Sequence, residues 1–164
     1  MLPRDTIDAF DKFLSERDLT LEAVVVGGTA LALLGVIDRH TRDVDVLDPD
    51  LPTEVVEAAV MFAAEQSTAG NVLADDWLNN GPSQLKQVLP DGWRGRLRPL
   101  YAGAALTLRV PGRADLLKSK LFSLCDRGTD LLDCVALAPT DEEIDEARDW
   151  LAEQDAHPDW PEHV

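Results

Sequence analysis

The chain has 164 residues, and its 31 acidic residues against 15 basic ones give a formal net charge of −16. This length predicts a single domain, and the 45% hydrophobic content is too high for a disordered acidic chain. The charge argues against general DNA binding, because sequence-independent binding depends on Lys and Arg. The only cysteines, Cys125 and Cys134, exclude a disulfide scaffold or a cysteine zinc site and indicate a reducing compartment.

No membrane span is predicted. The longest apolar run, residues 21–37, is interrupted by Glu22, by glycines and by Thr29, whereas a span needs about 20 mostly apolar residues. No basic segment precedes an apolar stretch at the N-terminus, so we expect a cytoplasmic protein. We expect residues 1–156 to form one domain and residues 157–164 to form a loose tail.

In chain order, hydrophobic spacing predicts a helix over residues 5–16, a strand over 23–26, a helix over 29–34 and a strand over 43–47. Thr53 is expected to cap the next helix. The apolar stripe of that helix is predicted to contain Val55, Val56, Ala59, Val60 and Ala63.

Residues 67–96 contain several glycines and prolines and are expected to be irregular. The runs 96–101 and 104–110 predict a hairpin. Helices are expected over 114–125, 130–137 and 140–154, the last opening with a capping box of Thr140 and Glu143. The pattern is that of a small α/β or α+β domain with a short mixed sheet flanked by helices.

Two elements carry the chemistry. Gly27 and Gly28 follow the first strand, and glycines there let a backbone approach a phosphate at the start of the Thr29 helix. Asp43 and Asp45 lie two apart on a predicted strand, so their carboxylates project from one face and can share a divalent metal. Mg²⁺ held by two carboxylates and substrate phosphates is the equipment for nucleotidyl transfer.

Each element alone has a simpler interpretation. A Gly-Gly turn after a strand is weak evidence for phosphate binding. An Asp-x-Asp strand is more often a solvated edge, and the nearby Asp48 and Asp50 favour that interpretation. The combination, in this order, is the specific signal.

The two elements together resemble the nucleotidyltransferase fold of the DNA polymerase β type. Residues 24–31, VVVGGTAL, match its first motif, and residues 39–46, RHTRDVDV, match the Arg-x-Thr-x-Asp-x-Asp form of minimal bacterial nucleotidyltransferases. Lys120, Arg127 and the run 130–133 are similar to motifs of the AbiEii-type toxin branch. The resemblance implies that Asp43 and Asp45 bind Mg²⁺ or Mn²⁺, and that Gly27, Gly28, Thr29, Arg39 and Lys120 bind the nucleotide.

The third carboxylate of that fold comes from a later strand, and the strand expected at 106–110 contains no acid. In the toxin-like branch a functional acid follows the lysine, so the resemblance implies Asp130 as the third acid, in preference to Asp115 or Asp133. Two plain alternatives stay open. Either Lys118 or Lys120 can simply extend from an apolar helix face, and Arg127 with Asp130 can form a surface ion pair.

The resulting hypothesis is a nucleotidyltransferase that moves NMP from an NTP to an acceptor hydroxyl. By analogy with toxin relatives the acceptor is tRNA or another RNA, and a protein or small-molecule acceptor is equally compatible with the composition. An RNA acceptor needs a local basic groove, for which arginines near the hairpin are available: Arg94, Arg96, Arg98, Arg109 and Arg113. The alternative is a catalytically weak nucleotide-binding or partner-binding module, such as an antitoxin-like component or a scaffold.

Overall fold

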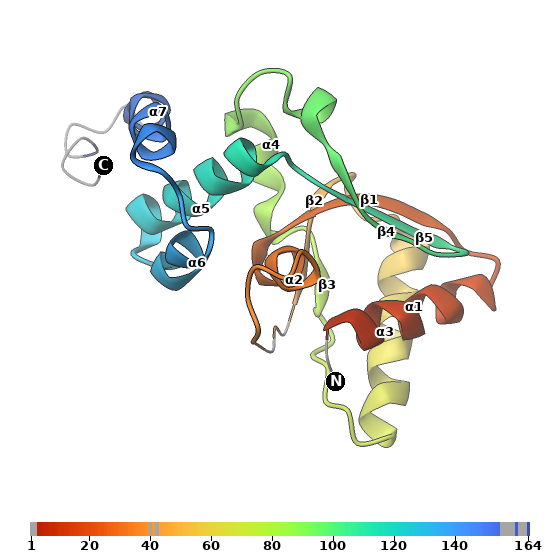
Figure 1. Cartoon of the computed structure of the whole chain (residues 1–164). Helices are drawn as coiled ribbons and strands as arrows, with labels where there is room; N and C mark the ends of the chain where they lie inside the picture. Colours follow the sequence, from red (N-terminus) through yellow and green to blue (C-terminus); the bar gives the residue numbers. More distant parts are fainter. Residues whose placement is uncertain (1–2, 40, 42, 155–159, 161–163) are drawn as a thin grey trace.

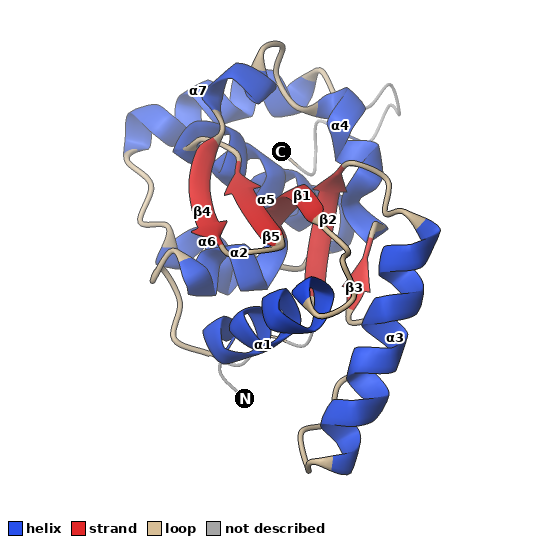
Figure 2. Ribbon diagram, turned by 90° about the vertical axis from the view of Figure 1, so that its right-hand side faces the viewer, coloured by secondary structure: helices blue, strands red, loops and turns tan. Residues whose placement is uncertain are grey.

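A five-stranded mixed sheet forms the centre of the computed structural model, which describes residues 3–39, 41, 43–154, 160 and 164 (Figures 1 and 2). Its strand order is β3-β2-β1-β5-β4. Strand β1 runs parallel to β5, and β2 runs parallel to β3, whereas the β1–β2 and β4–β5 pairs are antiparallel. The strands are β1 (Leu21–Val26), β2 (Val44–Asp48), β3 (Leu78–Asn79), β4 (Arg98–Ala102) and β5 (Leu106–Val110).

Helices flank this sheet, which confirms the predicted fold class. Helices α1 and α3 pack together against the sheet, and α5, α6 and α7 form a second group on the side of the molecule away from α3 (Figure 1). The helices are α1 (Pro3–Ser15), α2 (Gly27–Leu33), α3 (Thr53–Thr68), α4 (Leu85–Val88), α5 (Arg113–Arg127), α6 (Leu131–Ala136) and α7 (Asp141–Ala152), with 3-10 helices η1 (Gly81–Gln84) and η2 (Trp93–Arg96).

Strand β1 is buried on both faces. Because side chains alternate along a strand, Ala23 and Val25 enter the main core, while Val24 and Val26 enter a second cluster with Trp93. The second cluster is closed by the segment between β3 and β4, which the sequence predicts to be irregular. That segment contains short helical turns whose apolar residues cover the far face of the sheet.

Helix α3 is placed correctly by the sequence, but its predicted apolar stripe is partly wrong. Val56 and Val60 are each 39% exposed. Thr53 is the first helical residue, and no side chain caps the helix. The buried face consists of Val55, Ala58, Ala59, Phe62 and Ala63.

The hairpin of β4 and β5 is present, as predicted. Helix α7 opens with the predicted capping box, in which Thr140 and Glu143 bind each other's backbone N–H groups. In the segment expected to be a loose tail, Trp160 is buried and its indole N–H donates to the Leu151 carbonyl at 2.7 Å; residues 157–159 and 161–163 lie outside the described residues. Within the described part of the chain, no helix is both long and apolar enough to cross a bilayer.

Candidate functional site

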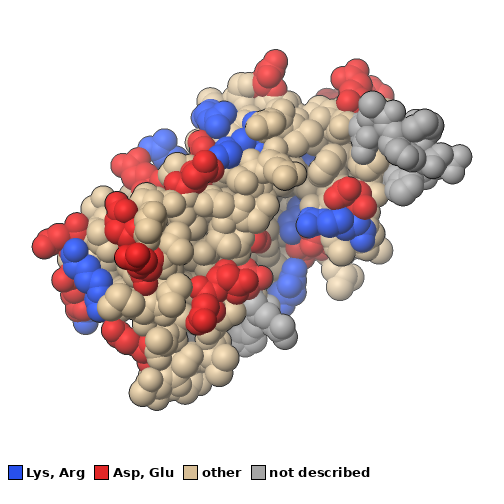
Figure 3. All heavy atoms as spheres, turned by 180° about the vertical axis from the view of Figure 1, so that it is seen from behind, with Lys and Arg blue, Asp and Glu red and all other residues tan. Residues whose placement is uncertain are grey.

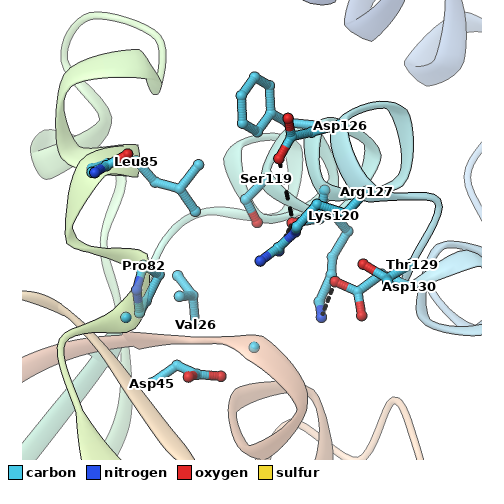
Figure 4. A pocket seen from close by; sticks show the side chains of 15 residues that line it. Val26, Asp45, Pro82, Leu85, Ser119, Lys120, Asp126, Arg127, Thr129 and Asp130 are labelled. Carbon is cyan, nitrogen blue, oxygen red and sulfur yellow. Dashed lines mark hydrogen bonds and ion pairs between the residues drawn. The ribbon is translucent and has the colours of Figure 1, made fainter. Parts of the chain in front are cut away.

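A cavity of about 470 Å³ opens between the sheet and helix α5 (Figure 4). Its floor is formed by the end of β1 and by β2, one wall by η1 and α4, and the other wall by α5 and the segment that leads into α6. The polar side chains that line it are Asp45, Gln84, Ser119, Lys120, Ser123, Asp126, Arg127, Thr129 and Asp130. Both Asp45 and Lys120, which the sequence singles out, therefore reach one cavity.

Asp45 lies on the floor of this cavity. In the sheet it is paired with Val26 of β1 on one side and Asn79 of β3 on the other. Burial raises the pKa of its carboxyl, and the nearby Asp43 carboxylate raises it further, although Lys120 acts in the opposite direction. A carboxylate in these surroundings is stabilised by a cation.

The sequence predicts that the two glycines form a turn before the helix. In the structure they are instead the first two residues of α2. Gly27 has a φ of +76°, and a Cβ there would collide with the Asp45 carboxylate. A Cβ on Gly28 would lie 3.0 Å from Thr41 Cγ2 and 3.5 Å from Arg39 Nη2. Gly27 thus lets the backbone approach Asp45, and Gly28 lets it approach the loop before β2. Gly27 lines the main cavity.

Asp43 directly precedes β2 and does not lie on that strand, contrary to the sequence prediction, and neither Asp43 nor Thr29 lines the main cavity. The buried Thr29 hydroxyl donates to the Asp43 carbonyl at 2.6 Å and is 2.6 Å from the Thr41 hydroxyl. Both Asp43 and Thr29 line a second, small cavity of about 20 Å³. The structure therefore gives Thr29 a clear role in fixing the loop that carries Asp43, whose carboxylate is near enough to affect Asp45.

Lys120 and Arg39 both bind Asp133, the acid to which Asp130 is preferred on sequence grounds as the third carboxylate. Lys120 Nζ is 2.8 Å from Asp133 Oδ2 and 3.1 Å from Asp130 Oδ2. Arg39 Nη2 donates to Asp133 Oδ1 at 2.8 Å. Burial alone raises the pKa of Asp133, but hydrogen bonds from Lys120 and Arg39 outweigh it and hold the pKa below its usual value.

The three acids considered as the third carboxylate have different surroundings. Asp115 is buried and accepts two hydrogen bonds from Arg96, at 2.8 Å each. Asp133 is 2% exposed and does not line the cavity, whereas Asp130 does. The preference for Asp130 thus agrees with its position at the cavity, and its contact there is with Lys120.

The structure also gives the contacts of Lys118, Lys120 and Arg127, for which the sequence leaves plain alternatives open. Lys118 extends toward the Trp150 ring, at 6.0 Å from its centroid, while Lys120 is buried beside the cavity. Arg127 does not pair with Asp130 as a helix-surface ion pair would; its guanidinium donates to Ser123 Oγ at 3.0 Å and lies in the cavity wall (Figure 4).

Strand β5 supplies no acid to the site. The one charged residue of this strand is Arg109, which is exposed. Among the described residues, no group of three or more His, Cys, Asp or Glu side chains is arranged to hold a metal ion.

The chain belongs to a family of nucleotidyltransferases of unknown function (DUF6036), whose model matches residues 5–140. The match includes every candidate site residue named above and agrees with the mixed sheet and its flanking helices. It does not test the similarity to the toxin branch. No curated protein and no solved structure matches the chain.

Proposed function

We propose that this chain transfers a nucleoside monophosphate from an NTP to an acceptor hydroxyl and releases pyrophosphate. The observation that carries the proposal is that Asp45 and Lys120, from separate elements, line one cavity. In the reaction the acceptor oxygen forms a bond to the α-phosphorus, and the bond between that phosphorus and the bridging oxygen of pyrophosphate breaks. Lys120 offsets the negative charge of the triphosphate, a role that suits a cation in a partly desolvated site.

The acidic residues fit a divalent cation. Asp45 is held against the Gly27 backbone, and its raised pKa reflects burial next to a second carboxylate. Two carboxylates with substrate phosphates match the oxygen ligands of Mg²⁺ or Mn²⁺. Asp43 and Asp45 would hold the ion, which when bound would offset charge on the phosphates.

The chain's own residues divide the remaining work. Arg127 and Ser123 lie on the α5 wall of the cavity, where a guanidinium and a hydroxyl suit phosphate or ribose oxygens. Asp130 lines the cavity beside Lys120 and would accept the proton of the attacking hydroxyl once the triphosphate has replaced it at the Lys120 ammonium group. Gly28, Thr29 and Arg39 shape the loop before β2 and so position Asp43.

The proposed acceptor is an RNA, and the analogy with toxin-like nucleotidyltransferases suggests tRNA. A protein acceptor is the alternative. The arginines near the hairpin do not favour a broad RNA surface, because acids of the chain already bind three of them: Arg94 with Asp48, Arg96 with Asp115, and Arg113 with Glu143. On the face shown in Figure 3, basic side chains lie beside acidic ones and do not merge into one basic surface. These charges are compatible with a short local contact between the protein and an RNA acceptor.

The test is transfer of label from each of the four α-labelled NTPs to total RNA and total protein, with Mg²⁺ or Mn²⁺. The matched variants are Asp45→Asn, at the cavity floor, and Glu22→Gln, which removes an exposed acid from β1 in the same sheet. The proposal predicts labelling by the parent and by Glu22→Gln, and loss of labelling in Asp45→Asn. Labelling that survives in Asp45→Asn would contradict it.

A second candidate is a module that binds nucleotide without transferring it. The absence of an acid from β5, together with the contact between Asp130 and Lys120, favours this candidate. It predicts Mg²⁺-dependent NTP binding by calorimetry that is lost in Asp45→Asn, with no pyrophosphate released and no label transferred.

A further inference from the structure

Asp133 connects three segments of the chain through one buried carboxylate. It lies in the first turn of α6, and each of its oxygens binds a different cation at 2.8 Å: Arg39 from the loop before β2 and Lys120 from α5. The carboxylate is 2% exposed, so water does not supply alternative partners. No oxygen of this carboxylate is left without a cation.

The two acids that bind Lys120 occupy different positions relative to the cavity. Asp130 lines the cavity and its side chain is 26% exposed, whereas Asp133 lies behind Lys120 and does not line it. A bound triphosphate can therefore replace Asp130 at the ammonium group without disturbing Asp133. Lys120 then keeps one counter-charge and one fixed position throughout.

Stability alone is a weak reason for this arrangement. Buried ion pairs contribute little net stability, because the cost of removing the charges from water offsets their attraction. Fixed placement of the Lys120 ammonium group beside an anion site is a use that can outweigh the cost of removing these charges from water. The Arg39 side chain is 53% exposed, so water could solvate its charge without Asp133. Its ion pair with the buried Asp133 carboxylate therefore serves to restrict the loop that leads to Asp43.

We propose that Asp133 is a positioning residue of the nucleotide site, which holds Lys120 in place for the triphosphate without touching it and, through Arg39, restricts the loop that leads to Asp43. This inference rests on the proposed function. It makes a prediction opposite in sign to simple charge repulsion. Removal of a negative charge near an anion site should tighten binding of the anion, whereas loss of positioning should weaken it.

The probe is inorganic tripolyphosphate, and its binding is measured by calorimetry with and without Mg²⁺. For Asp133→Asn we expect affinity to fall about tenfold, within the range found for contacting pairs, and KM for NTP to rise more than kcat falls. Asp115→Asn is the matched control, because Asp115 is an equally buried acid bound to an arginine away from the cavity. It should lose stability and keep tripolyphosphate affinity.

A double-mutant cycle separates positioning from general structural damage. If Asp133 acts through Lys120, Asp133→Asn should cause a much smaller loss of affinity in a Lys120→Met background than in the parent. Asp133→Glu keeps the charge and moves the carboxylate by one methylene, and it serves if Asp133→Asn does not fold. Positioning predicts weaker binding in Asp133→Glu, whereas a mere need for a buried charge predicts parental affinity.

The outcomes are distinct. Parental or tighter tripolyphosphate binding by folded Asp133→Asn overturns the inference and leaves the proposed transfer reaction standing. Equal losses in Asp133→Asn and Asp115→Asn also overturn it. If the parent itself binds neither tripolyphosphate nor NTP, the proposed function fails and the inference fails with it.

Discussion

Gly27 is the residue whose replacement tests the backbone approach to Asp45. Its φ is +76°, and a Cβ would collide with the Asp45 carboxylate; Gly35 has nearly the same φ, +72°, with no atom within 4 Å of the added Cβ. Gly35→Ala should therefore cost about 1 kcal/mol of unfolding free energy from the backbone alone. Gly27→Ala should cost about 1–3 kcal/mol more and weaken NTP binding. Urea unfolding measures both, and equal losses in the two variants would contradict the role given to Gly27.

Asp45 provides a pH test at the same scale. Because its pKa in the folded state is raised, its ionised form opposes folding, and this cost appears as the pH rises through the folded-state pKa. Asp45→Asn should thus be more stable than the parent at neutral pH without metal. The difference should shrink as the pH falls below the usual carboxyl range. A parent that is more stable than Asp45→Asn at neutral pH would show that the carboxylate is not strained by its surroundings.

The site residues show where reasoning from sequence reaches its limit. The alternation of strand residues predicts that Asp45 faces away from the Val44 and Val46 core, and it does. Asp130 and Asp133 are three residues apart, and no local pattern says which of them lies inside. That depends on how α6 packs against α5, which brings Asp133 to Arg39, a residue 94 positions away.

At the scale of elements, Asp11 of α1 holds the hairpin of β4 and β5. Its carboxylate accepts backbone N–H groups from Ala104, Ala105 and Leu106 at 2.7–3.1 Å. Asp11→Ala should lower the free energy of unfolding by about 1–3 kcal/mol, because these donors lose their acceptor. Asp5→Ala, an exposed acid of the same helix, should cost less. Similar losses in the two variants would mean that Asp11 is dispensable to the hairpin.

The same contact has a pH dependence of known sign. Burial by itself raises the pKa of Asp11, but the three backbone hydrogen bonds outweigh it and lower the pKa. The stability contributed by Asp11 is therefore present above the unfolded-state pKa and is lost as the pH falls through the folded-state value. The stability difference between the parent and Asp11→Ala should narrow in acid.

Elements with strong local signals could be predicted, and those set by tertiary packing could not. The β-branched run of β1, the hairpin and the capping box of α7 each have local causes, and all three are present. Helix α3 is apolar over much of its circumference, so the sequence did not show which stripe faces the core. The short helices α4 and η2 are held by the second hydrophobic cluster, whose members come from distant parts of the chain.

At the scale of the whole molecule, the net charge of −16 means that Mg²⁺ can raise the Tm either by binding at the site or by acting on the acidic surface. A ligand that binds the folded state at ten times its Kd stabilises that state by about 1.4 kcal/mol. Millimolar Mg²⁺ should raise the Tm of the parent more than that of Asp45→Asn, with ionic strength matched by NaCl to remove general screening. Equal shifts in the two proteins would show that Mg²⁺ acts on the acidic surface and not at the site.

The most direct measurement compares label transfer from α-labelled NTPs by Lys120→Met and Lys118→Met. The two lysines are two residues apart on α5, but Lys120 lines the cavity and Lys118 lies against Trp150. Because a cation that offsets charge in the reaction contributes about a hundredfold or more, Lys120→Met should reduce transfer by that order, while Lys118→Met should remain near the parent. Equal activities of the two variants would contradict the assignment of this cavity as the nucleotidyl transfer site.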